Sequence, residues 1–265
     1  MTTPGATRSA RVRARNLLII AIAGLSVGIG SFGIVSAVTT PRRTTSVYDP
    51  PVLAGQQIPG FCSGGFYARH GDAIVLTTTP HCASEGQVAV APGGMMLGVF
   101  GPTAKDVTCP YAGHTCAASD MNYLIVAPDR IPWGHLNEVD LGTGGYAIIP
   151  PGTKPLACAD IAIGDPVEID GRGIYRSGTV AEKGDNLKPP AEDGSYFPCM
   201  IASAIQIGDG DSGGAVLVRG IPGGGTSRSY GGSLGFTPLA EGLAELGLDL
   251  CDTPDCDLTP TRGSQ

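Results

Sequence analysis

The stretch Gly208-Asp-Gly-Asp-Ser-Gly-Gly-Ala-Val216 sets a single serine, Ser212, among glycines. Glycine lets the backbone turn tightly, so that peptide N–H groups can point into one concavity. A serine hydroxyl is a poor nucleophile at neutral pH. It reacts when a neighbouring base accepts its proton and when donors hold the oxyanion that forms. If Ser212 is a nucleophile, a histidine base and a carboxylate must lie elsewhere in the chain.

The base that this loop requires is expected at His81. The apolar segment 73–78 is rich in branched side chains, which predicts a strand, and His81 follows it closely. Loops at strand ends commonly carry reactive side chains. The other histidines lie in polar connections, where a structural role is expected: His70, His114 and His135.

The expected carboxylate is Asp120, which directly precedes the apolar run ending at Val126. A carboxylate at the start of a buried strand can enter the interior, where its charge needs a partner. The ring N–H of His81 would be that partner, and the contact would fix the tautomer of the imidazole. The alternative is that Asp120 only caps the strand. Asp106 and Asp129 lack a following apolar segment.

Together these residues resemble the chymotrypsin-like (trypsin-fold) serine peptidases, and among them the secreted bacterial branch. The most specific motifs are His81-Cys82 and Gly210-Asp-Ser-Gly-Gly214, with Asp120 between them in the chain. The opening segment Phe61-Cys-Ser-Gly-Gly-Phe66 is also similar to that branch. The resemblance extends to Thr237 and so covers most of the chain after the amino-terminal segment.

This resemblance implies an all-β fold with two antiparallel six-stranded β-barrels, at about 61–126 and 145–237, and an active site in the cleft between them. Short apolar runs at the spacing typical of barrels agree with it: 87–91, 95–99, 123–127, 166–170, 173–181, 200–205 and 213–219. Leucines at positions 239, 243 and 246 recur at helical spacing and predict a short C-terminal helix.

The resemblance also assigns the site. His81, Asp120 and Ser212 would form the catalytic triad, and the backbone N–H groups of Gly210 and Ser212 would form the oxyanion hole. Asp211 would turn inward and hold the loop through a salt bridge. In the family, the partner of this aspartate can be the new amino terminus that forms when an Ile-Val-Gly-Gly-like segment is cleaved. We find no such segment in this sequence. The candidate partners are therefore the internal arginines Arg172 and Arg176.

The substrate pocket is expected at Gln206, Asp209 and Thr237. By resemblance, the residue six positions before Ser212 forms the pocket floor, and here it is Gln206. A carboxylate there would select Arg or Lys, so its absence disfavours trypsin-like preference. Asp209 would favour basic groups near the scissile bond, or it only adds solubility. Thr237 belongs to the segment Ser233–Pro238, which stands where the family has a Ser-X-Gly strand that pairs with the substrate backbone. Here the segment leads into the leucine-bearing run 239–246, so the groove is expected to be remodelled.

Two departures from the family pattern, Pro80 and the altered groove segment, leave a second function open. Pro80 stands before His81, where small residues are usual, and proline fixes its own φ and lacks an N–H donor. An altered turn there would impair the base. The alternative to a serine endopeptidase is therefore an inactive homologue that serves as an exported binding module.

The amino-terminal residues predict export. Residues 1–16 carry four arginines and no acid, as expected of a basic cytoplasmic segment, and residues 17–38 form an uncharged, mostly apolar run. That run is long enough to span a bilayer as an anchor, although the small residues 35–37 would also suit signal cleavage. Residues 39–60 are expected to be a Thr/Pro-rich linker, 61–250 the protease domain and 251–265 a C-terminal tail.

The charge balance is acidic. The whole chain carries 17 basic and 24 acidic residues, for a net charge of −7. Four of the basic residues are the arginines of residues 1–16, so the rest of the chain is more acidic still. This balance argues against nucleic-acid binding. We expect a monomer that acts on peptides or proteins, with the membrane as a partner through residues 17–38.

The eight cysteines of an exported chain predict four disulfides. The resemblance implies the pair Cys62–Cys82, which would brace the strand before His81. Two further pairs would close short loops, Cys109–Cys116 and Cys251–Cys256, and the remaining pair would be Cys158–Cys199. A zinc site is disfavoured because C-x-x-C spacing is missing. We therefore expect neither metal nor cofactor.

Overall fold

The computed structural model describes residues 52–103, 115–142, 145–185, 195–230 and 232–257. They fall within one compact unit, Ala37–Gln265. The predicted basic segment and the apolar run 17–38 lie outside the described residues. Within the described ranges, no helix has the length and apolar character needed to cross a membrane.

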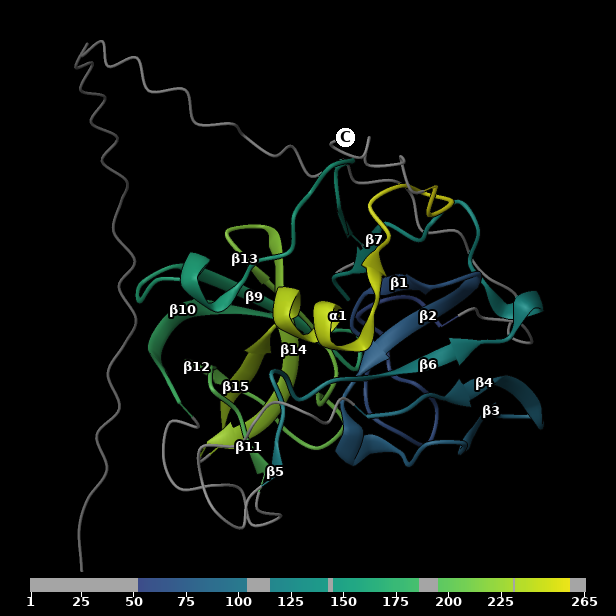
Figure 1. The fold of residues 1–265 in the computed structure, drawn as a ribbon, viewed down its shortest axis with the longest axis horizontal. Helices are drawn as coiled ribbons and strands as arrows, with labels where there is room; N and C mark the ends of the chain where they lie inside the picture. Colours follow the sequence, from purple (N-terminus) through teal and green to yellow (C-terminus); the bar gives the residue numbers. More distant parts are fainter. Residues whose placement is uncertain (1–51, 104–114, 143–144, 186–194, 231, 258–265) are drawn as a thin grey trace, which may run out of the picture. The chain divides into compact units, whose positions relative to one another are not determined.

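The first of two six-stranded assemblies is an antiparallel sheet in the order β16-β1-β2-β6-β4-β3 (Figure 1). In β3 and β4, Ala89 and Leu97 are buried in one core while Val88 and Met96 are exposed, whereas β2 and β6 are buried at nearly every position. Its strands are β1 (Tyr67–His70), β2 (Ala73–Thr78), β3 (Val88–Ala91), β4 (Met95–Phe100), β6 (Asn122–Val126) and β16 (Asp249–Leu250).

The second assembly is a closed barrel in the order β10-β12-β15-β14-β13-β9. Branched and aromatic side chains, including Val167, Ile201, Val216 and Phe236, fill its separate core. Its strands are β9 (Pro166–Gly171), β10 (Ile174–Gly184), β12 (Met200–Gln206), β13 (Ala215–Val218), β14 (Ile221–Tyr230) and β15 (Ser233–Pro238).

Short elements connect and cover these assemblies. β5 (Thr115–Cys116) pairs with β11 (Ser195–Tyr196), and β7 (Glu138–Asp140) pairs with β8 (Tyr146–Ile148). The 3-10 turns are η1 (Pro80–Cys82), η2 (Pro128–Arg130) and η3 (Cys158–Asp160), and the helix is α1 (Leu239–Leu246).

The predicted fold class is confirmed: the chain is mostly β, with a closed six-stranded barrel, a second six-stranded sheet and one short helix among the described residues. The predicted apolar runs correspond to strands. β14 was not predicted, because its Pro222-Gly-Gly-Gly225 stretch lacks the alternation that identifies a strand. The helix packs Leu239 and Leu243 into the first core.

Both ends of the described chain join the first assembly. Val52, Ala54 and Ile58 are buried in its core, although residues 39–60 were expected to be a linker. At the other end, β16 pairs with β1, and Cys251 and Cys256 of the expected tail are buried. These contacts cover the edge of β1, which would otherwise expose unpaired backbone groups.

Three of the four predicted disulfides are present. They are Cys62–Cys82, with Cα atoms 5.6 Å apart, Cys158–Cys199 and Cys251–Cys256. The predicted partner of Cys116 is Cys109, which lies outside the described residues. Cys62–Cys82 joins the segment before β1 to the turn after β2. Cys158–Cys199 lies at the second core, and Cys251–Cys256 lies at the first core.

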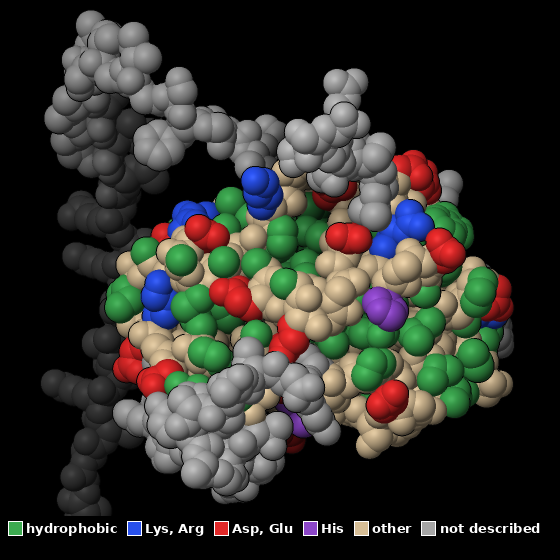
Figure 2. Space-filling view, viewed as in Figure 1, with side chains coloured by type: hydrophobic (Ala, Val, Ile, Leu, Met, Phe, Trp, Pro, Cys, Tyr) green, Lys and Arg blue, Asp and Glu red, His purple; other side chains and the backbone are tan. Residues whose placement is uncertain are grey.

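On the face seen in Figure 2, acidic and basic side chains are interspersed with apolar ones, and no basic patch gathers among the described residues in view.

Candidate active site

The ends of two paired strands bring His81 and Asp120 together. β2 and β6 are antiparallel, and Thr78, the last residue of β2, lies opposite Asn122, the first residue of β6. The turn that follows β2 and the loop that precedes β6 therefore meet at the same edge of the sheet. His81 lies in that turn, and Asp120 lies in that loop.

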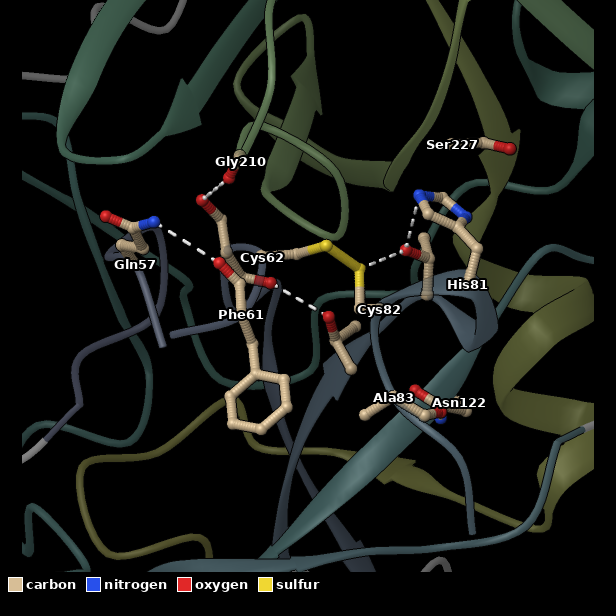
Figure 3. The surroundings of a disulfide bond; sticks show 12 residues. Gln57, Phe61, Cys62, His81, Cys82, Ala83, Asn122, Gly210 and Ser227 are labelled. Atoms are coloured by element: carbon tan, nitrogen blue, oxygen red, sulfur yellow. Dashed lines mark hydrogen bonds between the residues drawn. A yellow bond between two sulfur atoms is a disulfide. The ribbon is translucent and has the colours of Figure 1, made fainter. Parts of the chain in front are cut away.

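His81 presents its Nδ1 to the carboxylate of Asp120. Nδ1 lies 3.7 Å from Asp120 Oδ2, and the exposed fractions of the two side chains are 44% and 6%. The imidazole is thus open to solvent while the carboxylate is buried behind it. The same Oδ2 accepts a hydrogen bond from the hydroxyl of Ser227, on β14. Figure 3 shows Ser227 beside the ring of His81.

The loop before Asp120 is held from the second assembly. The hydroxyl of Thr237 lies 2.8 Å from that of Ser119 and accepts the backbone N–H of Asp120 at 3.1 Å. Thr237 is fully buried. The predicted pocket residue Thr237 therefore contacts the Asp120 loop from behind, and its side chain is not on a surface that a substrate could reach.

Pro80 fits the turn that carries His81. It begins the 3-10 turn η1, a position where the missing N–H is not needed and where the fixed φ suits the helical backbone. The N–H of Cys82 donates to the carbonyl of Thr79 at 3.1 Å, which closes the turn. The buried hydroxyl of Thr79 lies 3.5 Å from Nε2 of His81, a contact drawn in Figure 3.

The loop of Ser212 presents two unpaired backbone donors. Gly210 and Gly213 have φ values of +88° and +82°, a region that favours glycine. The carbonyls of Gly210 and Ser212 are both bonded to Ser63, at 2.7 Å each. Among the described residues, the N–H groups of Gly210 and Ser212 have no acceptor. These donors are the ones predicted to form the oxyanion hole.

The Ser212 loop packs tightly against the segment that carries His81. A Cβ on Gly213 would lie 2.3 Å from the hydroxyl oxygen of Thr78 and 2.4 Å from the carbonyl oxygen of Ser63. The Cys62–Cys82 disulfide joins the two chain segments involved. Ser212 itself is half-buried, and its hydroxyl forms no hydrogen bond with the described residues. Nε2 of His81 is directed to Thr79 instead.

Asp211 turns inward, and both predicted arginines bind it. Arg176 donates from Nη1 to Oδ2 at 2.7 Å and from Nη2 to Oδ1 at 3.0 Å, and Arg172 donates from Nε to Oδ1 at 3.0 Å. The carboxylate also accepts the N–H of Gly208. Burial by itself would raise the pKa of Asp211, but the bonds from Arg176, Gly208 and Arg172 outweigh burial and lower it. The carboxylate therefore stays charged and holds the loop.

An open hollow of about 500 Å³ lies beside this ion pair. Gln206 is part of its lining, together with Tyr175, Arg176, Ser177, Ala204 and Ile205. The exposed Asp209 does not line the hollow, and neither does Thr237. Of the three residues predicted for the substrate pocket, Gln206 is the one that lines this hollow.

Cys62, His81 and Cys82 offer three metal-ligand atoms within 4.8 Å of one another. Both sulfur atoms are joined in a disulfide, however. Zinc binds thiolates, and a disulfide holds none. The cluster therefore serves as a covalent brace beside the imidazole.

Two polar residues of the site escaped sequence reasoning. Ser233 begins the segment that departs from the family's groove strand, and it lies opposite Gln206; the serine that reaches Asp120 is Ser227 on β14. Ser63 was noted within the opening segment without a role. The segment Thr226-Ser227 lies among glycines and polar residues, and no local pattern distinguishes its serine from its neighbours.

Neither a protein-family model nor a curated protein sequence matches this chain. Solved structures do. A glutamic acid specific serine protease, described as using a novel histidine triad in substrate binding, is 25% identical. The match covers 75% of this chain and 100% of that chain, with a TM-score of 0.56.

Two other similar structures come from named bacteria. Protease A of Thermobifida fusca is 23% identical, with 75% of this chain and 97% of that chain covered and a TM-score of 0.56. The Nocardiopsis protease is 22% identical, with 75% and 98% covered and a TM-score of 0.57. The structural neighbours are bacterial chymotrypsin-like serine proteases, which confirms the resemblance predicted from the sequence.

Proposed function

We propose that this chain is a serine endopeptidase that hydrolyses peptide bonds through an acyl-enzyme, with His81, Asp120 and Ser212 as its triad. The similarity to bacterial serine proteases supports a protease of the chymotrypsin fold. The observation that carries the proposal further is the pair of unpaired N–H groups at Gly210 and Ser212, on a loop packed against the segment that bears His81.

In the proposed reaction, Nε2 of His81 leaves the hydroxyl of Thr79 and accepts the proton of Ser212 as its oxygen attacks the peptide carbonyl. Nδ1–H donates to Asp120, which stabilises the imidazolium. The N–H groups of Gly210 and Ser212 bind the oxyanion of the tetrahedral intermediate. His81 then protonates the leaving amine. Water, activated by the same base, attacks the acyl-enzyme, releases the acid product and restores the Ser212 hydroxyl.

We propose a neutral side chain on the amino side of the cleaved bond. Gln206 is neutral, so the hollow beside it lacks the carboxylate that would select Arg or Lys. The only cation in the lining, Arg176, is already bound to Asp211. The described histidines outside the triad contact other groups: His70 stacks against Tyr123, and His135 pairs with Glu138. A histidine-based selection of glutamate is therefore not proposed for this chain.

The proposed location is outside the cytoplasm. Disulfides persist in oxidising compartments, and three of them brace the described residues. The apolar run 17–38 would direct export as an anchor or as a signal peptide. Sequencing of the amino terminus of the mature protein separates these routes, because a cleaved signal peptide gives a new terminus after residue 37.

A fluorophosphonate probe tests the proposed function. It forms a covalent bond with a serine only when that serine is activated, so it should label wild-type protein at Ser212, as located by mass spectrometry. Ser212→Ala should not be labelled and should lose peptide hydrolysis, while its melting temperature stays within a few degrees. His81→Ala should slow labelling by several orders of magnitude.

A folded wild-type protein that the probe does not label would contradict the peptidase and support the exported binding module instead. Labelling at a serine other than 212 would contradict the assigned triad. Ser203→Ala is a suitable control for both assays, because Ser203 is buried on β12 and its hydroxyl contacts the N–H of Ile205 rather than a residue of the proposed triad.

A further inference from the structure

We propose that Ser63 is a positioning residue that sets the oxyanion hole, because its hydroxyl links the loop of Ser212 to the backbone of Arg172. This inference rests on the proposed function, since an oxyanion hole matters only if Ser212 is acylated. Ser63 is fully buried and lies between the disulfide residue Cys62 and the glycines 64–65. It has no contact with the reacting atoms.

Every polar group of Ser63 has a partner. Its N–H donates to the carbonyl of Ser212 at 2.7 Å, and its own carbonyl accepts the hydroxyl of Thr78 at 2.9 Å. Its hydroxyl donates to the carbonyl of Gly210 at 2.7 Å and accepts the N–H of Arg172 at 2.8 Å. The bond that Gly210 accepts is drawn as a dashed line in Figure 3.

These bonds hold alternate peptide planes of the loop. A peptide unit is planar, so a bond to its carbonyl fixes the whole unit. Ser63 fixes the unit that joins residues 210 and 211 and the unit that joins residues 212 and 213. The predicted donors, Gly210 N–H and Ser212 N–H, belong to the units just before each of these. With both of these units held by Ser63, the directions of the two donors depend on the backbone dihedrals at Gly210 and Ser212.

Gly210 is the residue of the loop whose conformation depends most on the hydrogen bond from Ser63. Its φ of +88° is freely accessible to glycine, which also tolerates many other conformations. Its carbonyl has no other donor among the described residues. Without the hydroxyl of Ser63, the peptide unit after Gly210 can rotate, and the two donors no longer converge.

The hydroxyl also couples the loop to the ion pair of Asp211. Arg172 has a φ of +55°, an uncommon value for a residue other than glycine, and its N–H is bonded to Ser63. From that position its side chain binds Asp211. Loss of the hydroxyl would leave the partly buried Arg172 N–H and Gly210 carbonyl without this partner, so both sides of the loop would loosen together.

Ser63→Ala, compared with Ser203→Ala, tests this inference on the full chain. Ser203 is also a buried serine, but it lies on β12 and its hydroxyl makes only a 3.5 Å contact with the N–H of Ile205. For Ser63→Ala we expect kcat on a peptide substrate to fall about 10- to 100-fold with KM within about twofold, because the missing restraint acts on oxyanion donors. The rate of fluorophosphonate labelling should fall in parallel. Ser203→Ala should keep both values within about twofold.

The outcomes separate this inference from the proposed function. Wild-type protein that is neither labelled nor active would contradict the function. Active wild type with an equally active, folded Ser63→Ala would overturn only the role of Ser63, as would a change in KM alone. If Ser63→Ala does not fold, Ser63→Thr and Ser63→Gly test the role of Ser63 instead. Ser63→Thr keeps the hydroxyl, so its kcat per folded molecule must be higher than that of Ser63→Gly. Failure of all three to fold would assign Ser63 to stability and overturn the inference.

Discussion

Arg176 and Asp211 form a two-point ion pair beneath the Ser212 loop, with Nη1 to Oδ2 at 2.7 Å and Nη2 to Oδ1 at 3.0 Å. The carboxylate has no exposed surface. Arg172 contributes a single bond, and 36% of its side chain is exposed. Both candidate arginines therefore bind the Asp211 carboxylate, and Arg176 makes the more buried contact with two hydrogen bonds rather than one.

Arg176→Ala should destabilise the protein more than Arg172→Ala does. Removing one partner of a buried ion pair costs about 3–5 kcal/mol when the other charge is left alone, and here Arg172 reduces the loss to about 2–4 kcal/mol. Arg172→Ala should cost about 1 kcal/mol, because its pair is partly exposed. Urea unfolding measures both. Arg219→Ala, at the surface pair with Asp165, is the control. Equal losses for the three variants would contradict this assignment.

Asp170→Asn should remove a pH dependence of stability. Asp170 is buried, and neither carboxylate oxygen has a hydrogen-bond partner among the described residues. Burial, and then the negative charge of Asp140, raises the pKa of Asp170 to about 8, although Arg176 opposes the shift. An unfolded Asp titrates near about 4, so between about pH 4 and 8 the folded state binds more protons, and the free energy of unfolding falls as pH rises.

The measurement is the melting temperature at several pH values between 5 and 8. We expect wild type to lose up to about 1.4 kcal/mol of unfolding free energy per pH unit from this group, and Asp170→Asn to lose less and to be the more stable protein at pH 8. Asp165→Asn is the control, because the Ala162 N–H lowers the pKa of that half-buried carboxylate. An unchanged pH slope in Asp170→Asn would refute the raised pKa.

Ser227→Ala should impair the base through Asp120. The hydroxyl of Ser227 donates to the buried oxygen that faces His81, and a hydrogen bond to a charged group contributes about 1.5–3 kcal/mol. Its loss leaves the carboxylate free to move away from Nδ1. If the proposed function holds, kcat should fall about tenfold with KM little changed, while Ser203→Ala stays near wild type. Identical kcat values for the two variants would exclude a role for Ser227.

Gly213→Ala should prevent the Ser212 loop from packing. Its φ of +82° strains any other residue by about 1–2 kcal/mol. A Cβ there would also lie 2.3 Å from the hydroxyl oxygen of Thr78, which adds about 1–3 kcal/mol of overpacking. Gly225→Ala is the matched control, because a Cβ at Gly225 has open space and no strained φ. Thermal melts that showed equal stability for the two variants would contradict the tight contact.

Local patterns carried much of the prediction. Short apolar runs identify β2, β4 and β6, because at most one residue of each strand is exposed. Pairing of β2 with β6 then makes His81 and Asp120 neighbours with only a short connection between each residue and its strand. β14 escaped because its glycines erase the alternation, and the buried residues 52–60 escaped because threonine and proline before them suggested a linker.

The sequence by itself determined the histidine, aspartate and serine candidates, because short motifs are local properties, and its resemblance to a known family implied the all-β class and three disulfides now seen in the structure. Only the tertiary structure decided that both arginines bind Asp211, that Ser227 supports Asp120, and that Ser63 holds the loop of Ser212. Ser63 and Gly210 are 147 residues apart in the chain. A contact between such distant segments depends on how the two assemblies pack, and no local pattern encodes that packing.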